Sequence, residues 1–253
     1  MHQQMIQNVE EEDDFNEVET TFGFCDPKIS DALTLSAFIP RFVPLNRLEV
    51  ARAVCHQTKV GTVVKDQDEE GNPGDSTFGF VSVLNLGLFV DVLPSIGKFV
   101  EWMKKLGDMS LNDILENHIN TTGLILNERA LGVPHELAPH LMRGLFNEIA
   151  WATEDLEKEE DRESFRFTHY IMVKKFTKSE EGFEFVNIED ELFFKNAPIK
   201  VEFETEGEDG DLEGVEYHRM IWAFDINTPN IVRQELNAMY GVDESQYAYE
   251  HQK

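Results

Sequence analysis

The chain has 253 residues and a formal net charge of -27, because it contains 49 Asp and Glu but only 22 Lys and Arg. Such an acidic surface repels phosphate backbones and anionic lipids, which excludes direct binding of nucleic acid or of a membrane surface as the expected function. Hydrophobic residues make up 41% of the sequence and include 19 Phe, enough to build a substantial core. Basic proteins or basic peptide segments are the partners that this charge favours.

Short-range features point to a reduced, intracellular protein. Cys25 and Cys55 form no CxxC motif and have no histidine at metal-ligand spacing, so we expect inert thiols. The opening residues, MHQQMIQNVEEEDD, contain neither the basic nor the apolar region of a signal peptide. No apolar run approaches the roughly 18 residues that a membrane span requires.

Composition divides the chain into three parts. Residues 1–20 are polar and acidic and are expected to form a disordered tail. Residues 21–241 are expected to form a single domain, and residues 242–253 a C-terminal tail.

The first half of the chain predicts four helices and a hairpin. The expected helix caps are Asp26 with Pro27, Asn46, Ser95 and Ser110, each followed by apolar residues at helical spacing. Strands are predicted over 59–65 and 78–86, where β-branched and aromatic residues flank a long acidic loop.

The middle of the chain, residues 121–151, predicts a buried strand that leads into a helix. Residues 124–126 are apolar, and residues 127–129 (Asn-Glu-Arg) are interpreted as a polar turn. A helix is expected from Pro134, with its core face formed by residues four apart: Leu137, Leu141, Leu145 and Ile149.

The second half predicts mainly strands. Residues 165–174 alternate between apolar and polar, and further strands are expected over 183–186, 199–203 and 215–226. Thr228 and Pro229 are expected to start a last helix that ends at Gly241. Together these elements predict a mixed α/β (α+β) fold, with a largely antiparallel central sheet flanked by helices.

No motif predicts a metal site or a catalytic group. The loop that begins at Asp66 resembles a calcium loop but has Thr77 where the bidentate Glu belongs. His135 and His140 are five residues apart, so their imidazoles lie on different helix faces, whereas a zinc pair needs a spacing of four.

One segment, Arg129 to Pro134, resembles a cofactor loop. The pyrophosphate loop of GCN5-related acetyltransferases reads Arg/Gln-x-x-Gly-x-Gly/Ala at a strand-to-helix junction, and here Arg129 and Gly132 match while Pro134 does not. That loop binds phosphate through successive backbone N–H groups, and proline has none. We therefore interpret the segment as a degenerate loop and expect no cofactor. Pro134 is also an ordinary residue at the first position of a helix.

Six segments in order resemble the BCCIP family of eukaryotic nuclear proteins. They are VETTFGFCDP (18–27), QTKVGTVVK (57–65), TFGFVSVLNL (77–86), GLILNERALGVPHELAPHLMRGLFNEIAWATED (123–155), FRFTHYIMVKKF (165–176) and VNIEDELFF (186–194). The family more often has an asparagine at the position of Gly132, and longer acidic tails than the residues before Val18 provide.

This resemblance implies an acetyltransferase-like fold without acetyl-CoA chemistry. The partners that it implies are a large-subunit ribosomal protein, regulators of the cell cycle and of recombination, and a phosphoinositide kinase. It also implies a protein of the nucleus and cytoplasm that supports nuclear transport and ribosome biogenesis.

Our main hypothesis is a non-enzymatic acidic chaperone or adaptor that binds a basic client. The candidate partner-binding residues lie in two acidic segments: Glu154, Asp155, Glu157, Glu159, Glu160 and Asp161 in the first, and Glu206, Glu208, Asp209 and Asp211 in the second. Each segment could equally be a solvated loop. The alternatives are a scaffold in the cell cycle and in DNA repair, and an acyl-CoA-dependent acyltransferase.

Overall fold

The computed structural model describes residues 21–57, 59–180, 182–205, 211–212 and 214–243. Eight strands form one sheet in the order β1-β2-β3-β4-β5-β8-β7, and β6 pairs with β5 off this path. The strands are β1 (Thr21–Cys25), β2 (Thr62–Gln67), β3 (Pro73–Asn85), β4 (Thr122–Arg129), β5 (His169–Ser179), β6 (Gly182–Glu184), β7 (Ile199–Glu202) and β8 (Tyr217–Asp225).

Helices connect these strands and cover the sheet. The α-helices are α1 (Ala32–Phe38), α2 (Arg47–Gln57), α3 (Leu86–Phe89), α4 (Pro94–Lys105), α5 (Met109–Asn117), α6 (Ala138–Asp155), α7 (Glu159–Glu163), α8 (Ile188–Asn196) and α9 (Thr228–Tyr240). Short 3-10 helices are η1 (Ile29–Asp31), η2 (Ile119–Thr121) and η3 (His135–Leu137). No helix in the described part of the chain is long and apolar enough to cross a membrane.

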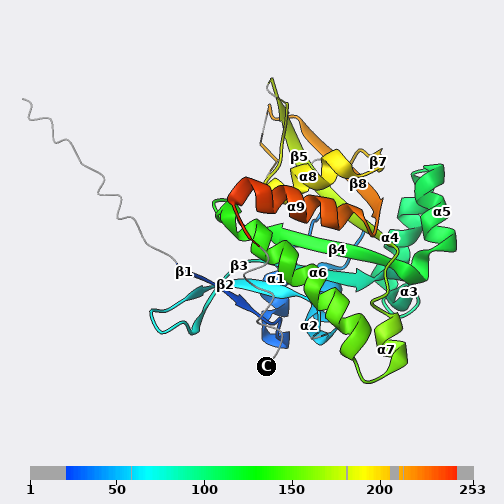
Figure 1. The fold of residues 1–253 in the computed structure, drawn as a ribbon. Helices are drawn as coiled ribbons and strands as arrows, with labels where there is room; N and C mark the ends of the chain where they lie inside the picture. The colour runs from blue at the N-terminus through cyan, green and yellow to red at the C-terminus, as the bar shows by residue number, and fades with distance from the viewer. Residues whose placement is uncertain (1–20, 58, 181, 206–210, 213, 244–253) are drawn as a thin grey trace, which may run out of the picture.

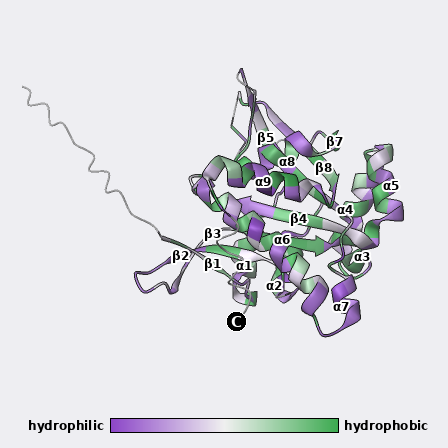
Figure 2. Cartoon of the chain, viewed as in Figure 1, coloured by the Kyte–Doolittle hydropathy of each residue, from purple (hydrophilic) through white to green (hydrophobic). Residues whose placement is uncertain are grey.

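The sheet separates two apolar cores. One core packs α1, α2, α4 and α5 against one face of the sheet, and the other packs α6, α8 and α9 against the opposite face. Figure 1 shows α6 crossing the near side of the sheet at β4, with α9 on the same side next to α6 and α8. In Figure 2 these helices carry polar residues on their visible outer side, as expected of amphipathic helices that bury one stripe.

One strand pair differs from the rest, because β4 and β5 are parallel while every other pair is antiparallel. The parallel pairing covers only three residues of β4, Thr122 to Leu124. Beyond that point β4 continues along β3 and β5 continues along β8, so the two strands diverge (Figure 1).

The fold class predicted from the sequence is confirmed: the fold is mixed α/β with an open, mostly antiparallel sheet flanked by helices. The predicted β2–β3 hairpin, the core face of α6 and the end of α9 at Gly241 are also present. The division into two tails and one domain stays a prediction.

Several local predictions were wrong. The expected turn over 127–129 is the last part of β4, and β5 begins at His169 instead of residue 165. Pro134 precedes η3 instead of starting α6, whose first turn contains Pro139.

Three predicted helix caps were also wrong. The first helical turn begins at Ile29, two residues after the expected start at Pro27. Ser95 lies within the first turn of α4, after Pro94. Asp108 caps α5 in place of Ser110, because its carboxylate accepts the Leu111 N–H at 2.8 Å.

The parallel junction between β4 and β5 depends on a residue without a side chain. A Cβ at Gly123 would lie 2.6 Å from Val83 Cγ2 and 3.0 Å from Tyr170 Cδ1. We expect Gly123→Ala to lower the free energy of unfolding by about 1–3 kcal/mol, the usual cost of overpacking, in urea unfolding followed by circular dichroism. The matched control is Gly144→Ala in α6, where the new methyl group meets only Thr62 Oγ1 at 3.9 Å. Alanine favours the helix by about 0.5–1 kcal/mol, so this control should be neutral or stabilising. Equal destabilisation by both variants would contradict the prediction.

Candidate functional site

The turn after β4 lacks the backbone donors of a phosphate-binding loop. The Val133 N–H donates to the Ala130 carbonyl at 3.4 Å, and Gly132 has a φ of 85°, which fits the third position of a type II turn. Pro134 follows and has no N–H. The turn itself therefore explains Gly132. The Val133 N–H is already used within the turn, and Pro134 has no N–H to offer a phosphate.

The Arg129 side chain points into the protein and not toward a ligand in this loop. Its Nη2 lies 2.7 Å from Glu189 Oε2, and its Nε donates to Asn187 Oδ1 at 3.1 Å. The side chains of Arg129 and Glu189 are 1% and 0% exposed. Arg129, which suggested phosphate binding in the sequence, is thus one half of a buried ion pair.

A second buried cation, Lys174 of β5, lies in the space between the diverging strands. Its Nζ lies 3.1 Å from Glu128 Oε1 of β4 and 3.1 Å from Asp190 Oδ2 of α8. It also donates to the Asn127 carbonyl of β4. Lys174 therefore joins β4, β5 and the first turn of α8.

Two asparagines connect the two ion pairs into one network. The Asn127 side-chain amide donates to Glu189 Oε1 at 2.9 Å and to Asp190 Oδ1 at 3.3 Å. The Asn187 amide donates to Asp190 Oδ2 at 2.9 Å. The network fills the gap where the sheet opens, with charges that are paired and hydrogen-bonded as buried charges must be. This network was not predicted from the sequence, because NER at 127–129 and NIED at 187–190 look like surface segments.

Burial and the neighbouring charges shift the pKa values in this network. Burial lowers the pKa of Lys174, but the charges of Asp190 and Glu128 outweigh this effect and hold it above its ordinary value. Burial raises the pKa of Asp190, although the Lys174 charge opposes it. Burial also raises the pKa of Glu128 to about 7, against the effect of Lys174. Glu128 therefore takes up and releases a proton close to neutral pH.

A cavity of about 360 Å³ borders Glu128, Lys174 and Asp190, and residues 37–42 line its other side. A carboxyl that titrates near neutral pH beside a cavity could act as a general base. However, the turn from Ala130 to Pro134 offers little to hold a phosphorylated carrier next to it. No group of three or more His, Cys, Asp and Glu in the described part of the chain is arranged to hold a metal.

The first predicted acidic segment lies at the end of α6 and in α7. One of its six acids, Glu159, is paired, since Arg162 Nε donates to Glu159 Oε2 at 2.9 Å and Arg166 contacts both Glu159 and the neighbouring Glu163. The remaining five are exposed and form no ion pair with any described residue: Glu154, Asp155, Glu157, Glu160 and Asp161. We call these five residues the acidic rim.

The one described acid of the second predicted acidic segment, Asp211, is not available to bind a partner. Asp211 lies 3.0 Å from Lys175 Nζ, also pairs with Arg219, and has a side chain that is 17% exposed. It is thus engaged inside the protein, and we remove it from the partner-binding candidates. Glu206, Glu208 and Asp209 lie outside the described residues.

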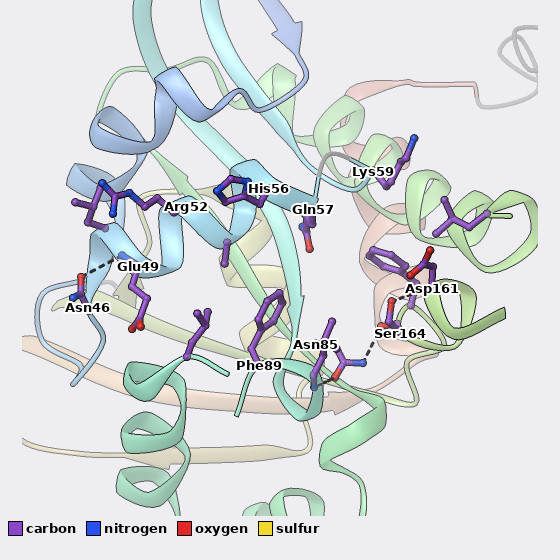
Figure 3. A pocket seen from close by; sticks show the side chains of 16 residues that line it. Asn46, Glu49, Arg52, His56, Gln57, Lys59, Asn85, Phe89, Asp161 and Ser164 are labelled. Atoms are coloured by element: carbon purple, nitrogen blue, oxygen red, sulfur yellow. Dashed lines mark hydrogen bonds between the residues drawn. The ribbon is translucent and has the colours of Figure 1, made fainter. Parts of the chain in front are cut away.

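The structure also forms a groove that the sequence did not predict. It has a volume of about 800 Å³ and lies between α2, α3 and the connection from α6 to α7. Figure 3 shows Arg52 and His56 on the α2 side and Asp161 with Ser164 on the opposite side. The lining comes from three segments far apart in the chain, so no local sequence signal could have indicated it.

Comparison with known proteins agrees with the fold. A family model described as BCCIP matches residues 17–208, more than half of the chain. A BCCIP homolog from Arabidopsis thaliana is 28% identical over 94% of this chain and 79% of the plant protein. The mouse BRCA2 and CDKN1A-interacting protein is 26% identical over 72% of this chain and 63% of the mouse protein. The crystal structure of BCP1 from Saccharomyces cerevisiae, 19% identical, aligns over 92% of this chain and 97% of that chain with a TM-score of 0.65.

Removal of one partner from the buried pair should be costly. We expect Arg129→Met to lower the free energy of unfolding by about 3–5 kcal/mol, because Glu189 would keep a buried charge without its cation. The matched control is Arg166→Met, since Arg166 forms ion pairs while its side chain is 46% exposed. An exposed pair contributes about 1 kcal/mol or less. Chemical unfolding of both variants measures the difference, and equal losses would contradict a structural role for the network.

Glu128 should make stability depend on pH. Its pKa rises from 4.5 when exposed to about 7 in the fold, so between these values the folded chain keeps a proton that the unfolded chain releases. The stabilisation is complete below pH 4.5 and is lost as the pH rises to about 7. We expect the free energy of unfolding of the wild type to fall over this range relative to that of Glu128→Gln, in urea titrations at half-unit pH steps.

A second buried carboxyl provides a comparison for this pH effect. Burial raises the pKa of Glu148 to about 7, although its carboxylate accepts the Gly61 N–H at 2.8 Å. Glu148→Gln should therefore remove another part of the fall in the free energy of unfolding between pH 4.5 and 7, in addition to the part that Glu128→Gln removes. Parallel pH profiles for the wild type and Glu128→Gln would show that Glu128 does not titrate in this range.

Proposed function

Because the chain belongs to the BCCIP family, we propose that it is a non-enzymatic adaptor that binds a basic client through its acidic rim. Family membership supports an adaptor-type role, and the mouse relative is named for two proteins with which it interacts. The observation that carries the acidic part of the proposal is the group of five exposed acids, without ion pairs to described residues, at the end of α6 and in α7.

The acidic rim fits electrostatic recruitment of a basic protein. Its carboxylates are exposed, so they keep their interaction with water and do not require desolvation before a partner arrives. Rim charges of this kind mainly raise the association rate and make the affinity depend on salt. The net charge of -27 over the whole chain adds long-range attraction for a cationic partner.

We infer that the client is a large-subunit ribosomal protein, which this chain shields during nuclear transport and ribosome biogenesis. Ribosomal proteins are strongly basic because they contact RNA phosphates, so a free one needs an acidic surface that RNA will later replace. This role would place the protein in the nucleus and the cytoplasm. Both inferences extend the family resemblance and the charge.

The geometry beside β4 supports the non-enzymatic part of the proposal. In the turn from Ala130 to Pro134 the N–H groups of Ala130 and Val133 donate to carbonyls and Pro134 has no N–H, and Arg129 is committed to Glu189. Charged side chains occupy the opening between β4 and β5. An acyltransferase would need this region to hold a phosphorylated carrier, and these contacts oppose it.

A second candidate function is a scaffold in cell-cycle and recombination control. The name of the mouse relative, BRCA2 and CDKN1A-interacting protein, favours this function. Such a scaffold could use the same surfaces, so only the identity of captured partners separates it from the chaperone.

The acidic rim should control client binding. We expect Glu154→Gln/Glu157→Gln/Glu160→Gln to weaken binding of the basic client by roughly tenfold, because three exposed charges at about 0.5 kcal/mol each amount to about 1.5 kcal/mol, and about 1.4 kcal/mol is tenfold. A pull-down from native lysate with quantitative mass spectrometry identifies the client. Titration of the purified client at 50 and 300 mM NaCl then gives the affinity, which should also fall at the higher salt.

The matched control removes the same charge elsewhere. Glu69, Glu116 and Glu184 are exposed and lie outside the rim, so Glu69→Gln/Glu116→Gln/Glu184→Gln should change the affinity by less than about twofold. An affinity that does not respond to salt would refute the electrostatic mechanism. Micromolar binding of acetyl-CoA in calorimetry would instead favour the acyltransferase.

A further inference from the structure

The α2 side of the groove carries cations in a chain that has few of them. Arg52 and His56 are one helical turn apart on α2, and Lys59 follows just after the helix. All three are exposed, and none forms an ion pair with a described residue. Lys59 lies 5.9 Å from the Trp151 ring centroid. The whole chain has 49 Asp and Glu for 22 Lys and Arg, so two exposed cations without an ion pair to a described residue, Arg52 and Lys59, are a specific feature of this side.

The α2 side of the groove also carries one acid, Glu49, whose carboxylate accepts a hydrogen bond from the protein itself. Glu49 Oε2 accepts the Ser95 N–H at the start of α4, at 3.2 Å. A helix N-terminus carries a partial positive charge that attracts a carboxylate, which explains why the Glu49 side chain points to the start of α4. The hydrogen bond leaves the charge of Glu49 in place, so Glu49, Arg52 and Lys59 together give the α2 side of the groove a net charge of +1.

The floor of the groove is apolar and fixed in place. Leu88 is 53% exposed, while Phe89 and Leu93 pack against one core and Leu156 and Phe165 against the other. Apolar residues held by the cores on both sides of the sheet provide a rigid surface for an apolar side chain of a partner.

The opposite wall is negative. Asp161 lines the groove from α7 and belongs to the acidic rim, and Figure 3 shows it across the pocket from His56. The groove thus has an apolar floor between a positive wall and a negative wall.

The groove lining also limits the shape of an occupant. The sheet edges are β1 and β7, and the one strand residue in the lining, Asn85 of β3, pairs with Gly123 of β4. The pairing of β3 with β2 ends at Val81, and beyond it the Gln57 side chain covers this edge by donating to the Val83 carbonyl at 3.0 Å. A peptide strand could not extend the sheet here, which leaves insertion of a helix between side chains as the mode of recognition.

We propose that this groove binds an amphipathic helix of a partner protein, with an apolar stripe flanked by acidic residues on one side and basic residues on the other. The apolar stripe lies on Leu88, Phe89 and Leu93, the acidic flank faces Arg52 and Lys59, and the basic flank faces Asp161. Opposite wall charges determine the direction in which the helix lies, since the reversed helix would place like charges together. This surface shares only Asp161 with the acidic rim, and the proposal does not depend on the basic client.

Three synthetic peptides test the proposal: fluorescein-labelled (ELAALKA)2, with one acidic and one basic flank, (ELAALEA)2, with two acidic flanks, and (KLAALKA)2, with two basic flanks. Fluorescence anisotropy with the full chain should show tightest binding by (ELAALKA)2. We expect Arg52→Glu/Lys59→Glu to weaken this peptide by roughly tenfold and to shift the preference toward (KLAALKA)2. Leu88→Ser should weaken it several-fold.

The matched control is Lys98→Glu/Lys105→Glu, which changes the charge by the same amount at exposed positions outside the groove. It should change the affinity for (ELAALKA)2 by less than twofold, and thermal unfolding should show that both double variants are folded. Arg52→Gln/Lys59→Gln gives a milder test if charge reversal destabilises α2. Equal binding by the groove and control variants would overturn the proposal, as would equal affinity for all three peptides.

This experiment distinguishes the groove from the acidic rim as a client site. Glu154→Gln/Glu157→Gln/Glu160→Gln changes no residue that lines the groove, so it should leave (ELAALKA)2 binding within about twofold while client binding falls. Loss of the peptide in that variant would assign the peptide to the acidic rim and overturn the groove proposal.

Discussion

The divergence of β4 and β5 is the constraint on which the rest of the structure depends. After three parallel pairs the two strands separate, and backbone groups at the inner edge of β4 lose a strand partner. Lys174 and Asn187 supply hydrogen bonds to the Asn127 carbonyl, and the carboxylates of α8 balance the buried cations. Because an unpaired buried charge is so costly, these contacts fix where α8 begins and how it meets the sheet.

This arrangement changes what the opening in the sheet can do. A gap between diverging strands could accept a ligand, but here side chains of the protein occupy it and leave a cavity of about 360 Å³ at its border. The interior of the sheet therefore serves stability, apart from Glu128, which titrates near neutral pH. The proposed binding of macromolecular partners uses the outer surfaces instead.

The two outer surfaces differ in charge and shape although they meet at Asp161. The acidic rim is exposed and consists of carboxylates, which suits steering of a basic protein. The groove has an apolar floor between walls of opposite charge, which suits a defined segment held in one direction. An adaptor that holds two partners close together needs such a pair of adjacent but chemically distinct sites.

The sequence by itself determined the elements whose signals are local. The core stripe of α6 and the glycine that ends α9 follow from residue spacing, and the fold class follows from the alternation of elements. Tertiary structure decided the rest. Asn127 to Arg129 are as polar as a turn, yet they lie in β4 because partners about 60 residues away neutralise them inside the protein. Ion pairs with Lys175 and Arg219 likewise leave the Asp211 side chain mostly buried. The groove arises because the fold brings three distant segments together. Local sequence reports the preference of a side chain for water or for a core, whereas pairing between distant charges can reverse that preference.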